Sequence, residues 1–299
     1  MIDLITYLDK EKIVYELNKS TKELVSFKIG GIANIVIYPD KTEQLSSLIS
    51  LLKDKSIKYC ILGNGTNTYF SSNGYNGAVI STKLLNSISL ENDKITASCG
   101  CTINNVALKA CENNLTGMEF TYGMPGCIGG CIYMNASAFN CDMTDIVYKT
   151  KVLNTDTEEI SDLTLNEHKY GMKHSVFMEK PEYIVLEATF KLSYGIQEEI
   201  RAKMDENLIK REASQPLDLP SAGSVFKRPL VGYSSKYIDD AGLKGERVGD
   251  AIVSTKHAGF ILNTGNATSK DVKDLIEIIK DRVFGKFGVE LEEEIIFTE

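Results

Sequence analysis

Two cysteines lie four positions apart in a glycine-rich stretch of the chain, which reads GMPGCIGGCIYMNASAFN from Gly123 to Asn140. Three uses suit such a stretch: a metal site on Cys127 and Cys131, a flexible linker, or a loop whose backbone approaches a ligand closely. Zinc ligands usually come as C-x₂₋₄-C pairs with a second pair or histidines nearby. Here the cysteine spacings are C-x-C and C-x₃-C, and all three histidines lie downstream. We therefore expect no metal site and small, buried thiols.

Glycine clusters are the second feature that points to chemistry. They are Gly30-Gly31, the LGNGTN segment at 62–67 and the 123–140 stretch. Glycine permits positive φ and lets a ligand reach backbone N–H groups with no Cβ in the way. LGNGTN could form a phosphate-binding turn, but it lacks the third glycine of a Rossmann fingerprint and the Gly-Lys-Ser/Thr of a Walker loop. Taken alone, each of these loops is more often structural than functional.

Composition limits the class of protein. The chain has 299 residues, 43% apolar and 25% charged, which is typical of globular proteins and suggests two or three modest domains. Its net charge of −8 and pI of about 5.2 argue against nucleic-acid or anionic-membrane partners. Seven cysteines, an odd number, argue against a disulfide framework. The N-terminus lacks the pattern of a signal peptide, and no stretch approaches the roughly 18 apolar residues of a membrane span, so we expect a cytoplasmic protein.

Periodicity predicts the elements that must position these loops. Helices are predicted at 2–18, at 42–55 with Thr42 as a cap, and at 102–113, and strands in NIVIYP, KYCIL, GAVIST and KITASCG. DIVYKTKVLN and EYIVLEATFKLSYG alternate like strands of an antiparallel sheet, and 196–213 reads as a charged helix. A natural boundary lies near 195–215.

The last part of the chain has its own pattern. HAGFILN reads as a strand, and TSKDVKDLIEIIKDRVFGKFG as a helix capped by Thr268 or Ser269, with Gly288 just past its end. VELEEEIIF reads as a terminal strand, whose alternation would put Glu292 and Glu294 on one face and Leu291 and Ile295 on the other.

Six ordered segments resemble the UDP-N-acetylenolpyruvoylglucosamine reductases. They are SFKIGGIANIVIYP, ILGNGTNTYFSSNGYNGAVI, LTGMEFTYGMPGCIGGCIYMNASAFN, LPSAGSVFKRP, DDAGLKGERVGDAIVSTKHAGFILNTGNATSKDV and FGVELEEEI. The resemblance spans nearly the whole chain, and six motifs in order are far more specific than any one of them. The length resembles the family's shorter, type II form.

The resemblance implies an α+β fold. It would comprise an FAD-binding domain of the PCMH or vanillyl-alcohol-oxidase type, in two subdomains, and a C-terminal α+β substrate-binding domain. We predict the first domain over 1–195, with subdomains of about 1–82 and 83–195, and the second over 196–299.

The resemblance also implies a reaction: reduction of UDP-N-acetylglucosamine enolpyruvate to UDP-N-acetylmuramate in peptidoglycan synthesis, with FAD as cofactor and NADPH as hydride donor. The enolpyruvyl ether receives a hydride at its methylene carbon. Negative charge then develops on the neighbouring carbon and spreads into the carboxylate, so the site needs a proton donor and a group that stabilises the carboxylate. The implied partner is this small UDP-sugar, with no nucleic acid or membrane, and we expect a monomer.

Two loops would hold FAD in a member of this family. Backbone donors of the first would bind the diphosphate, and the second would run along the cofactor. The residues are, in the first, Gly63, Asn64, Gly65, Thr66 and Asn67, and, in the second, Gly123, Pro125, Gly126, Gly129 and Gly130.

Ser224 of AGSVF matches the family's proton donor, and Glu294 of LEEEI matches its second catalytic residue. Lys227 and Arg228 could supply positive potential and contact substrate, and His257 of TKHAGF matches a position near the substrate. Three of these residues have a plainer alternative: Ser224 as a turn serine bonded to its own loop, Glu294 as part of a solvated acidic edge, and His257 as a structural histidine. No G-x-S-x-G elbow surrounds Ser224, which excludes a hydrolase nucleophile.

The third catalytic position departs from the family. The family reads Tyr-Arg-x-Ser-x-Phe, whereas this chain has Met172 and Lys173 in MKHSVF. Lys173 keeps the charge that would bind the substrate carboxylate but loses the bidentate fork of arginine, which could cost on the order of 3 kcal/mol, or a hundredfold in rate. Alternatively, Lys173 is a solvated surface lysine.

Further departures lie elsewhere in the motifs. Ser137 and Asn140 replace family glycines, and Ile296 replaces a basic residue. All these departures leave open a related flavoenzyme with another substrate, or a non-catalytic flavin or nucleotide-sugar binding protein.

Overall fold

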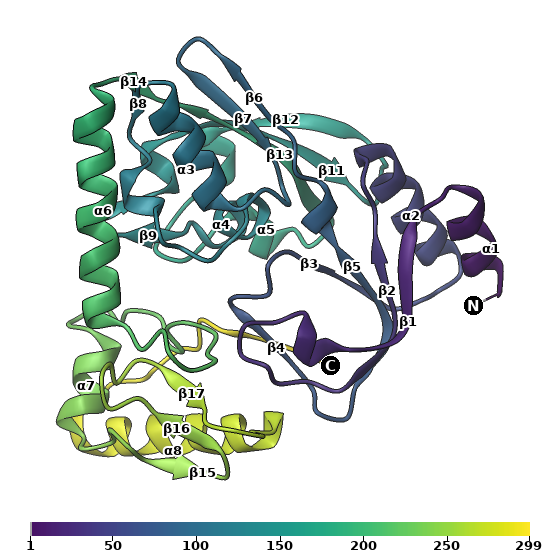
Figure 1. Cartoon of the computed structure of the whole chain (residues 1–299). Coiled ribbons are helices and arrows are strands. Elements are labelled where there is room, and N and C mark those ends of the chain that lie inside the picture. The colour runs from purple at the N-terminus through teal and green to yellow at the C-terminus, as the bar shows by residue number, and fades with distance from the viewer. Residues whose placement is uncertain (1) are drawn as a thin grey trace. The chain divides into compact units, whose positions relative to one another are not determined.

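The computed structural model describes residues 2–299, which separate into two compact units (Figure 1). The larger unit comprises residues 2–16, 35–64 and 77–210, and the smaller unit comprises 17–34, 65–76 and 211–299. Each unit is therefore assembled from segments that are distant in the sequence. The predicted division between 195 and 196 falls just before helix α6 (Gln197–Ser214), and it stays a prediction.

A five-stranded antiparallel sheet dominates the larger unit. Its strands are, in order, β12 (Ile160–Thr164), β11 (Val147–Asn154), β13 (Tyr183–Lys191), β7 (Lys94–Ser98) and β6 (Ile88–Glu91). β13 lies in the middle, and its Leu186, Ala188 and Phe190 are at most 1% exposed. The prediction that DIVYKTKVLN and EYIVLEATFKLSYG are strands of an antiparallel sheet is therefore confirmed, and the two strands pair with each other.

Three helices, α3 (Ile103–Glu112), α4 (Ile128–Met134) and α5 (Val176–Glu179), lie together against one face of this sheet (Figure 1). α3 starts where predicted, because the Thr102 side chain accepts a hydrogen bond from the Asn105 N–H and caps the helix. Its apolar residues Ile103, Val106 and Ala107 are at most 1% exposed. The helix therefore holds the chain that follows it in a fixed place above the sheet.

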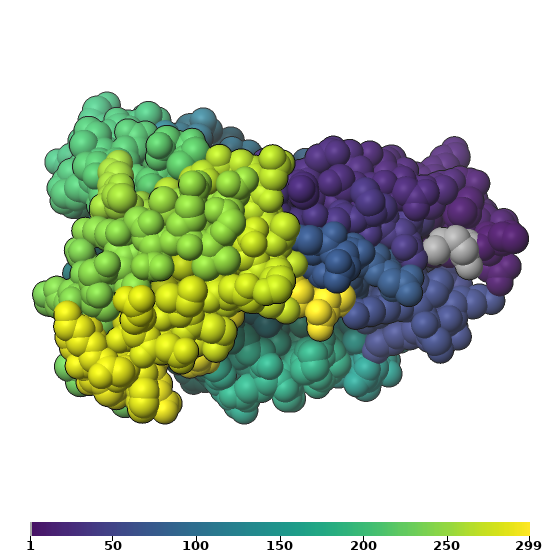
Figure 2. Space-filling view, turned by 90° about the horizontal axis from the view of Figure 1, so that it is seen from below, coloured from purple at the N-terminus to yellow at the C-terminus, as the bar shows by residue number. Residues whose placement is uncertain are grey.

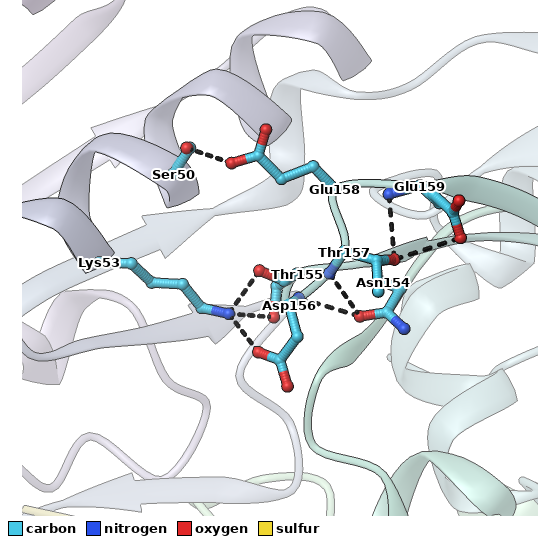
Figure 3. A network of polar contacts seen from close by, with 8 residues as sticks. All are labelled: Ser50, Lys53, Asn154, Thr155, Asp156, Thr157, Glu158 and Glu159. Carbon is cyan, nitrogen blue, oxygen red and sulfur yellow. Dashed lines mark hydrogen bonds and ion pairs between the residues drawn. The ribbon is translucent and has the colours of Figure 1, made fainter.

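A polar network anchors α2 (Thr42–Asp54) to the turn between β11 and β12 (Figure 3). Lys53 Nζ donates to the carbonyl and to Oγ1 (2.9 Å) of Thr155 and pairs with Asp156 (2.6 Å), while Ser50 bonds Glu158. Three acceptors on one ammonium fix the turn more firmly than a single surface ion pair would. The network thus joins residues from both predicted parts of the FAD-binding domain.

The other elements up to residue 194 are short. They are α1 (Ile2–Lys10), β3 (Tyr59–Leu62), β8 (Leu115–Thr116), β9 (Ser137–Ala138), β10 (Cys141–Asp142) and β14 (Ser193–Tyr194). β3 also belongs to a four-stranded sheet of order β1-β2-β5-β3, with β1 (Val14–Ser20), β2 (Ile32–Tyr38) and β5 (Tyr75–Ser81). β3 and β5 are parallel, so the glycine loop after β3 follows the carboxyl end of a parallel strand.

The smaller unit contains the three-stranded antiparallel sheet β15 (Arg247–Val248), β16 (Ala251–Val253) and β17 (Ile261–Asn263), with helices α7 (Ser234–Asp240) and α8 (Ser269–Phe287). In addition, β18 (Ile296–Thr298) pairs in parallel with β4 (Thr68–Phe70). The residues from 211 onward, light green to yellow, gather into one continuous mass in Figure 2.

α8 confirms the sequence prediction at both ends. The Thr268 side chain accepts from the Asp271 N–H, Asp271 accepts in return from the Thr268 N–H, and Gly288 closes the helix at φ 67°. Leu275 and Ile279 recur at helical spacing and are at most 1% exposed. The helix therefore buries one apolar face in the core of the smaller unit.

The predicted helix over 2–18 is wrong in its second half. α1 ends at Lys10, and Lys12 has φ 57°, a value that an α-helix does not contain. Val14 and Leu17 of the expected apolar face are 58% and 47% exposed. Pairing of β1 with β2 outweighs the helical periodicity of this segment.

Two other predictions need correction. The terminal strand covers only β18, and the Glu292–Glu294 run lies before it, although Leu291 and Ile295 are buried as expected. α2 has Lys41, not Thr42, at its N-cap, without a side-chain cap.

No helix within residues 2–299 combines the length and apolarity that a membrane crossing would need.

Candidate active site

Two of the predicted glycine loops meet in the larger unit. Asn64 Nδ2 donates to the Pro125 carbonyl oxygen over 2.9 Å. A Cβ placed on Gly63 would lie 2.2 Å from Cys127 Sγ, closer than any real contact. The loop after β3 and the loop before α4 therefore lie side by side, and glycine at 63 is required by the Cys127 side chain.

The loop after β3 presents unused donors. Among residues 2–299, the backbone N–H groups of Gly63, Asn64, Gly65 and Thr66 donate to no other group. Gly65 has φ 62°, and its own carbonyl accepts from the Ser26 N–H at 3.0 Å. Consecutive free amides around a positive-φ residue are a donor set that suits an anion such as a diphosphate. The loop thus fits the FAD diphosphate that the family would place here.

Asn104, in the first turn of α3, fixes the start of the second loop. Its Oδ1 accepts from the Gly123 N–H (2.7 Å), and its Nδ2 donates to the Met124 carbonyl (2.9 Å). Gly123 has φ 85°, so these two bonds hold a backbone conformation that other residues rarely adopt. Sequence reasoning missed Asn104, because a polar residue in a first helical turn has no distinctive pattern.

Gly129 and Gly130 lie inside helix α4, which corrects the prediction of a loop through this stretch. A Cβ on Gly129 would lie 3.1 Å from the Cβ of Cys99, and one on Gly126 would lie 3.1 Å from Cys131 Sγ. These glycines therefore allow close packing of cysteine side chains within the protein.

The cysteines near α4 are buried free thiols, as predicted. Burial raises the pKa of the Cys131 thiol to about 12 and that of Cys101 to about 11. Such thiols are neutral and unreactive at pH 7. Residues 2–299 contain no group of three or more His, Cys, Asp or Glu that could hold a metal ion, and the expectation of no metal site stays a prediction.

Lys173 lies in a tight turn of the larger unit, between Gly171 and His174. Two hydrogen bonds close the turn: the Gly171 N–H donates to the His174 carbonyl (3.1 Å), and the His174 N–H donates to the Gly171 carbonyl (3.3 Å). Lys173 has φ 53°, and the preceding Met172 is 62% exposed. The Lys173 side chain is half-buried, and burial, which raises the pKa of the Cys131 thiol, is opposed in part by the positive charge of Lys173.

Ser224 lies in an extended segment of the smaller unit. Ser224 forms an isolated antiparallel β-bridge with Phe260, and the N–H of the neighbouring Val225 donates to the Gly259 carbonyl (2.8 Å). The Ser224 hydroxyl has no hydrogen bond to another part of residues 2–299. The role of Ser224 as proton donor stays a prediction.

Glu294 lies on the other side of the same segment. Its N–H donates to the Val225 carbonyl at 2.7 Å, next to Ser224 in the chain. Asn67 Nδ2 donates to the Glu294 carbonyl (2.9 Å), and the Asn67 carbonyl accepts from the Ile296 N–H (2.8 Å). The structure thus brings the backbones of Ser224 and Glu294 together and shows Asn67 holding Glu294. Because Asn67 and Glu294 are 227 positions apart, the sequence carries no sign of this contact.

The predicted substrate-binding residues have partners of their own. Lys227 pairs with Glu292, and the Arg228 guanidinium lies 4.1 Å from the centre of the Tyr233 ring. His257 Nδ1 accepts from the Gly259 N–H (3.2 Å), and burial is the main cause that lowers the pKa of its imidazole. His257 therefore shapes the turn whose carbonyl bonds Val225. Contact of these three residues with substrate stays a prediction.

The sequence matches two family models. Residues 33–163 match an FAD binding domain, and residues 215–298 match the C-terminal domain of UDP-N-acetylenolpyruvoylglucosamine reductase. A relative with that enzyme name from Caldanaerobacter subterraneus is 45% identical over 99% of this chain and 97% of its own. The chain belongs to the UDP-N-acetylenolpyruvoylglucosamine reductase family. Another such reductase, from Caldicellulosiruptor saccharolyticus, is 42% identical over 97% of this chain and 94% of its own.

A solved structure confirms the fold of this family member. The crystal structure of UDP-N-acetylenolpyruvylglucosamine reductase from Thermus caldophilus matches 96% of this chain and 99% of its own, with a TM-score of 0.80 and 28% identity. Together with the two domain matches, it confirms an α+β fold with an FAD-binding domain and a C-terminal reductase domain.

The Gly63–Cys127 contact yields a stability prediction. Gly63→Ala should lower the free energy of unfolding by about 1–3 kcal/mol, because the new methyl overpacks against Cys127 Sγ. Adding Cys127→Ala should recover most of this loss, since the Cys127 Cβ lies 3.8 Å away. Gly285→Ala in α8, where a Cβ meets nothing within 4 Å, should not destabilise. Thermal denaturation of the wild type and these three variants measures this, and failure of Cys127→Ala to rescue would contradict the packing account.

Proposed function

We propose that this protein reduces UDP-N-acetylglucosamine enolpyruvate to UDP-N-acetylmuramate with NADPH, in the synthesis of peptidoglycan precursors. Family membership over nearly the full chain supports the proposal. The observation that carries it is the backbone pairing of Glu294 with Val225, which brings the two expected catalytic residues together on adjoining segments. A monomeric cytoplasmic protein without nucleic-acid or membrane partners remains our expectation.

FAD would be held mainly by backbone groups of this chain. The free N–H groups of the 63–66 segment would bind its diphosphate, and Gly123, Pro125 and Gly126 would line it. FAD, when bound there, would supply the hydride chemistry that links NADPH to the substrate's methylene carbon. The protein's own contribution is to orient the two reactants and to handle charge and protons.

Ser224 would supply the proton. Its hydroxyl, unengaged within residues 2–299, would donate to the carbon beside the carboxylate as negative charge develops there. Glu294 would act as the second catalytic residue, held in place by Asn67 and Val225. Because Lys227 pairs with Glu292, part of its charge is already balanced, and Arg228 is turned to Tyr233.

Lys173 would stabilise the substrate carboxylate. A charge-stabilising contact made in the transition state is worth on the order of 3 kcal/mol in rate. Lysine gives a point charge without the planar fork of arginine, and Met172 cannot donate a hydrogen bond as the family's tyrosine could. These two departures favour, as a second candidate, a related flavoenzyme that acts on a different substrate, or a binding protein without activity.

Half-reactions test the proposal. The purified protein should be yellow with FAD, NADPH should bleach it under anaerobic conditions, and UDP-N-acetylglucosamine enolpyruvate should restore the colour. Bleaching without restoration by this substrate would refute the proposed substrate and favour the second candidate. Absence of bleaching by NADPH would refute the proposed reductant.

Ser224→Ala should separate the two half-reactions. Bleaching by NADPH should stay within about twofold of the wild type, whereas substrate-driven reoxidation should slow at least a hundredfold, as expected for loss of a general acid. Ser224→Cys, which keeps a proton donor, should recover part of the rate. Equal losses in both half-reactions would remove Ser224 from the role of proton donor.

Lys173→Arg should keep or raise the rate of substrate-driven reoxidation, because arginine restores the fork and tolerates the backbone no worse than lysine does. Lys173→Met, which removes the charge at similar length, should slow that step about a hundredfold. Stopped-flow reoxidation of all three proteins measures this. A rate for Lys173→Met close to the wild type would show that the carboxylate is bound elsewhere.

A further inference from the structure

The backbone of Lys173 adopts an unfavourable conformation. Its φ of 53° lies in the left-handed region, which residues with a Cβ avoid. Such a conformation persists only where surrounding contacts impose it, and it is common at functional sites. The contacts that impose it on Lys173 therefore bear on what this lysine does.

Asn135 holds one side of the turn. Its Nδ2 donates to the Gly171 carbonyl over 2.9 Å, and the side chain is buried, with 2% of its surface exposed. Asn135 itself closes helix α4, with φ 44° and ψ 61°. The amide therefore fixes the residue two positions before Lys173 to the end of a helix.

Ser175 holds the other side. Its hydroxyl donates to the Tyr133 carbonyl, in the last turn of α4, over 2.6 Å, and its side chain has no exposed surface. Gly171 and Ser175 flank the turn, so both of its ends are fastened to the same helix end. Just before the turn in the chain, the His168 and Tyr170 rings stack with their centroids 4.9 Å apart and an interplanar angle of 17°.

The other end of α4 reaches the proposed cofactor loops. Cys127 is its N-cap, and a Cβ on Gly63 would collide with Cys127 Sγ. All these residues belong to the larger unit. One seven-residue helix thus contacts the proposed diphosphate loop at its start and the Lys173 turn at its end.

We infer that Asn135 and Ser175 are positioning residues, which fix the Lys173 ammonium where it can meet the carboxylate of an anionic substrate. The inference rests on the proposed function of Lys173. Lysine has a flexible side chain without the preorganised geometry of arginine, so a fixed backbone matters more for it. The two residues act through Lys173 and touch no reacting atom.

Asn135→Gly tests this with little backbone strain, because glycine adopts positive φ readily. The variant should keep its FAD content and its rate of bleaching by NADPH. Substrate-driven reoxidation should slow about tenfold, and the KM for UDP-N-acetylglucosamine enolpyruvate should rise. Asn140→Gly is the matched control, since Asn140 also has positive φ (63°) but is exposed, and it should change none of these quantities.

A double-mutant cycle separates positioning from general structural damage. In a Lys173→Met background, Asn135→Gly should have no further effect on reoxidation, because its target is already gone. The same tenfold loss in both backgrounds would overturn the inference. Ser175→Ala, measured in the same cycle, replaces Asn135→Gly if the latter does not fold.

These outcomes distinguish the proposed function from the inference that Asn135 and Ser175 position Lys173. If the wild type is not reoxidised by the substrate, the proposed function fails, and the inference fails with it. If the wild type is active and the losses are additive, only the positioning inference fails.

Discussion

The close approach of Gly63 and Cys127 is the constraint on which the proposed cofactor site depends. With 2.2 Å between Cys127 Sγ and the place where a Cβ would stand, a side chain at 63 would push the two loops apart. The Asn64 bond to the Pro125 carbonyl joins the same two loops. Glycine at 63 therefore meets a requirement of protein packing in addition to any role toward a ligand.

In the smaller unit, too, contacts within the protein fix the backbone of the proposed site. Its proposed catalytic residues are placed by backbone hydrogen bonds, with Glu294 bonded to Val225 on one side and Gly259 bonded to Val225 on the other. Backbone pairing of this kind costs no side-chain entropy. Asn67 adds one side-chain bond, to the Glu294 carbonyl, so a residue expected to bind cofactor also supports the segment that carries the proposed catalytic residue Glu294.

What the sequence could predict follows from the range of the interactions involved. The ends of α8 are set by Thr268, Asp271 and Gly288, all local, and these were predictable. The path of residues 14–20 depends on pairing with β2, and the local periodicity wrongly predicted a helix there. Asn104, Asn67 and Asn135 act on carbonyl or amide groups that are distant in the chain or lack a spacing rule, so no pattern reveals them. The ordered motifs predicted the family correctly, but they show none of these contacts.

The replacement of arginine by lysine at position 173 can be understood in these terms. An arginine fork carries its geometry in the side chain, so its backbone can tolerate some freedom. A lysine ammonium has no such geometry, so its position depends more strongly on the backbone turn that carries the lysine. Here that turn is fastened at both ends to α4, by Asn135 and Ser175, and its backbone is held at φ 53°. Positive φ alone does not single out this lysine, since Lys12, Lys28 and Lys169 share it; the two bonds that fasten its turn to α4 carry the argument that its position is fixed for a function.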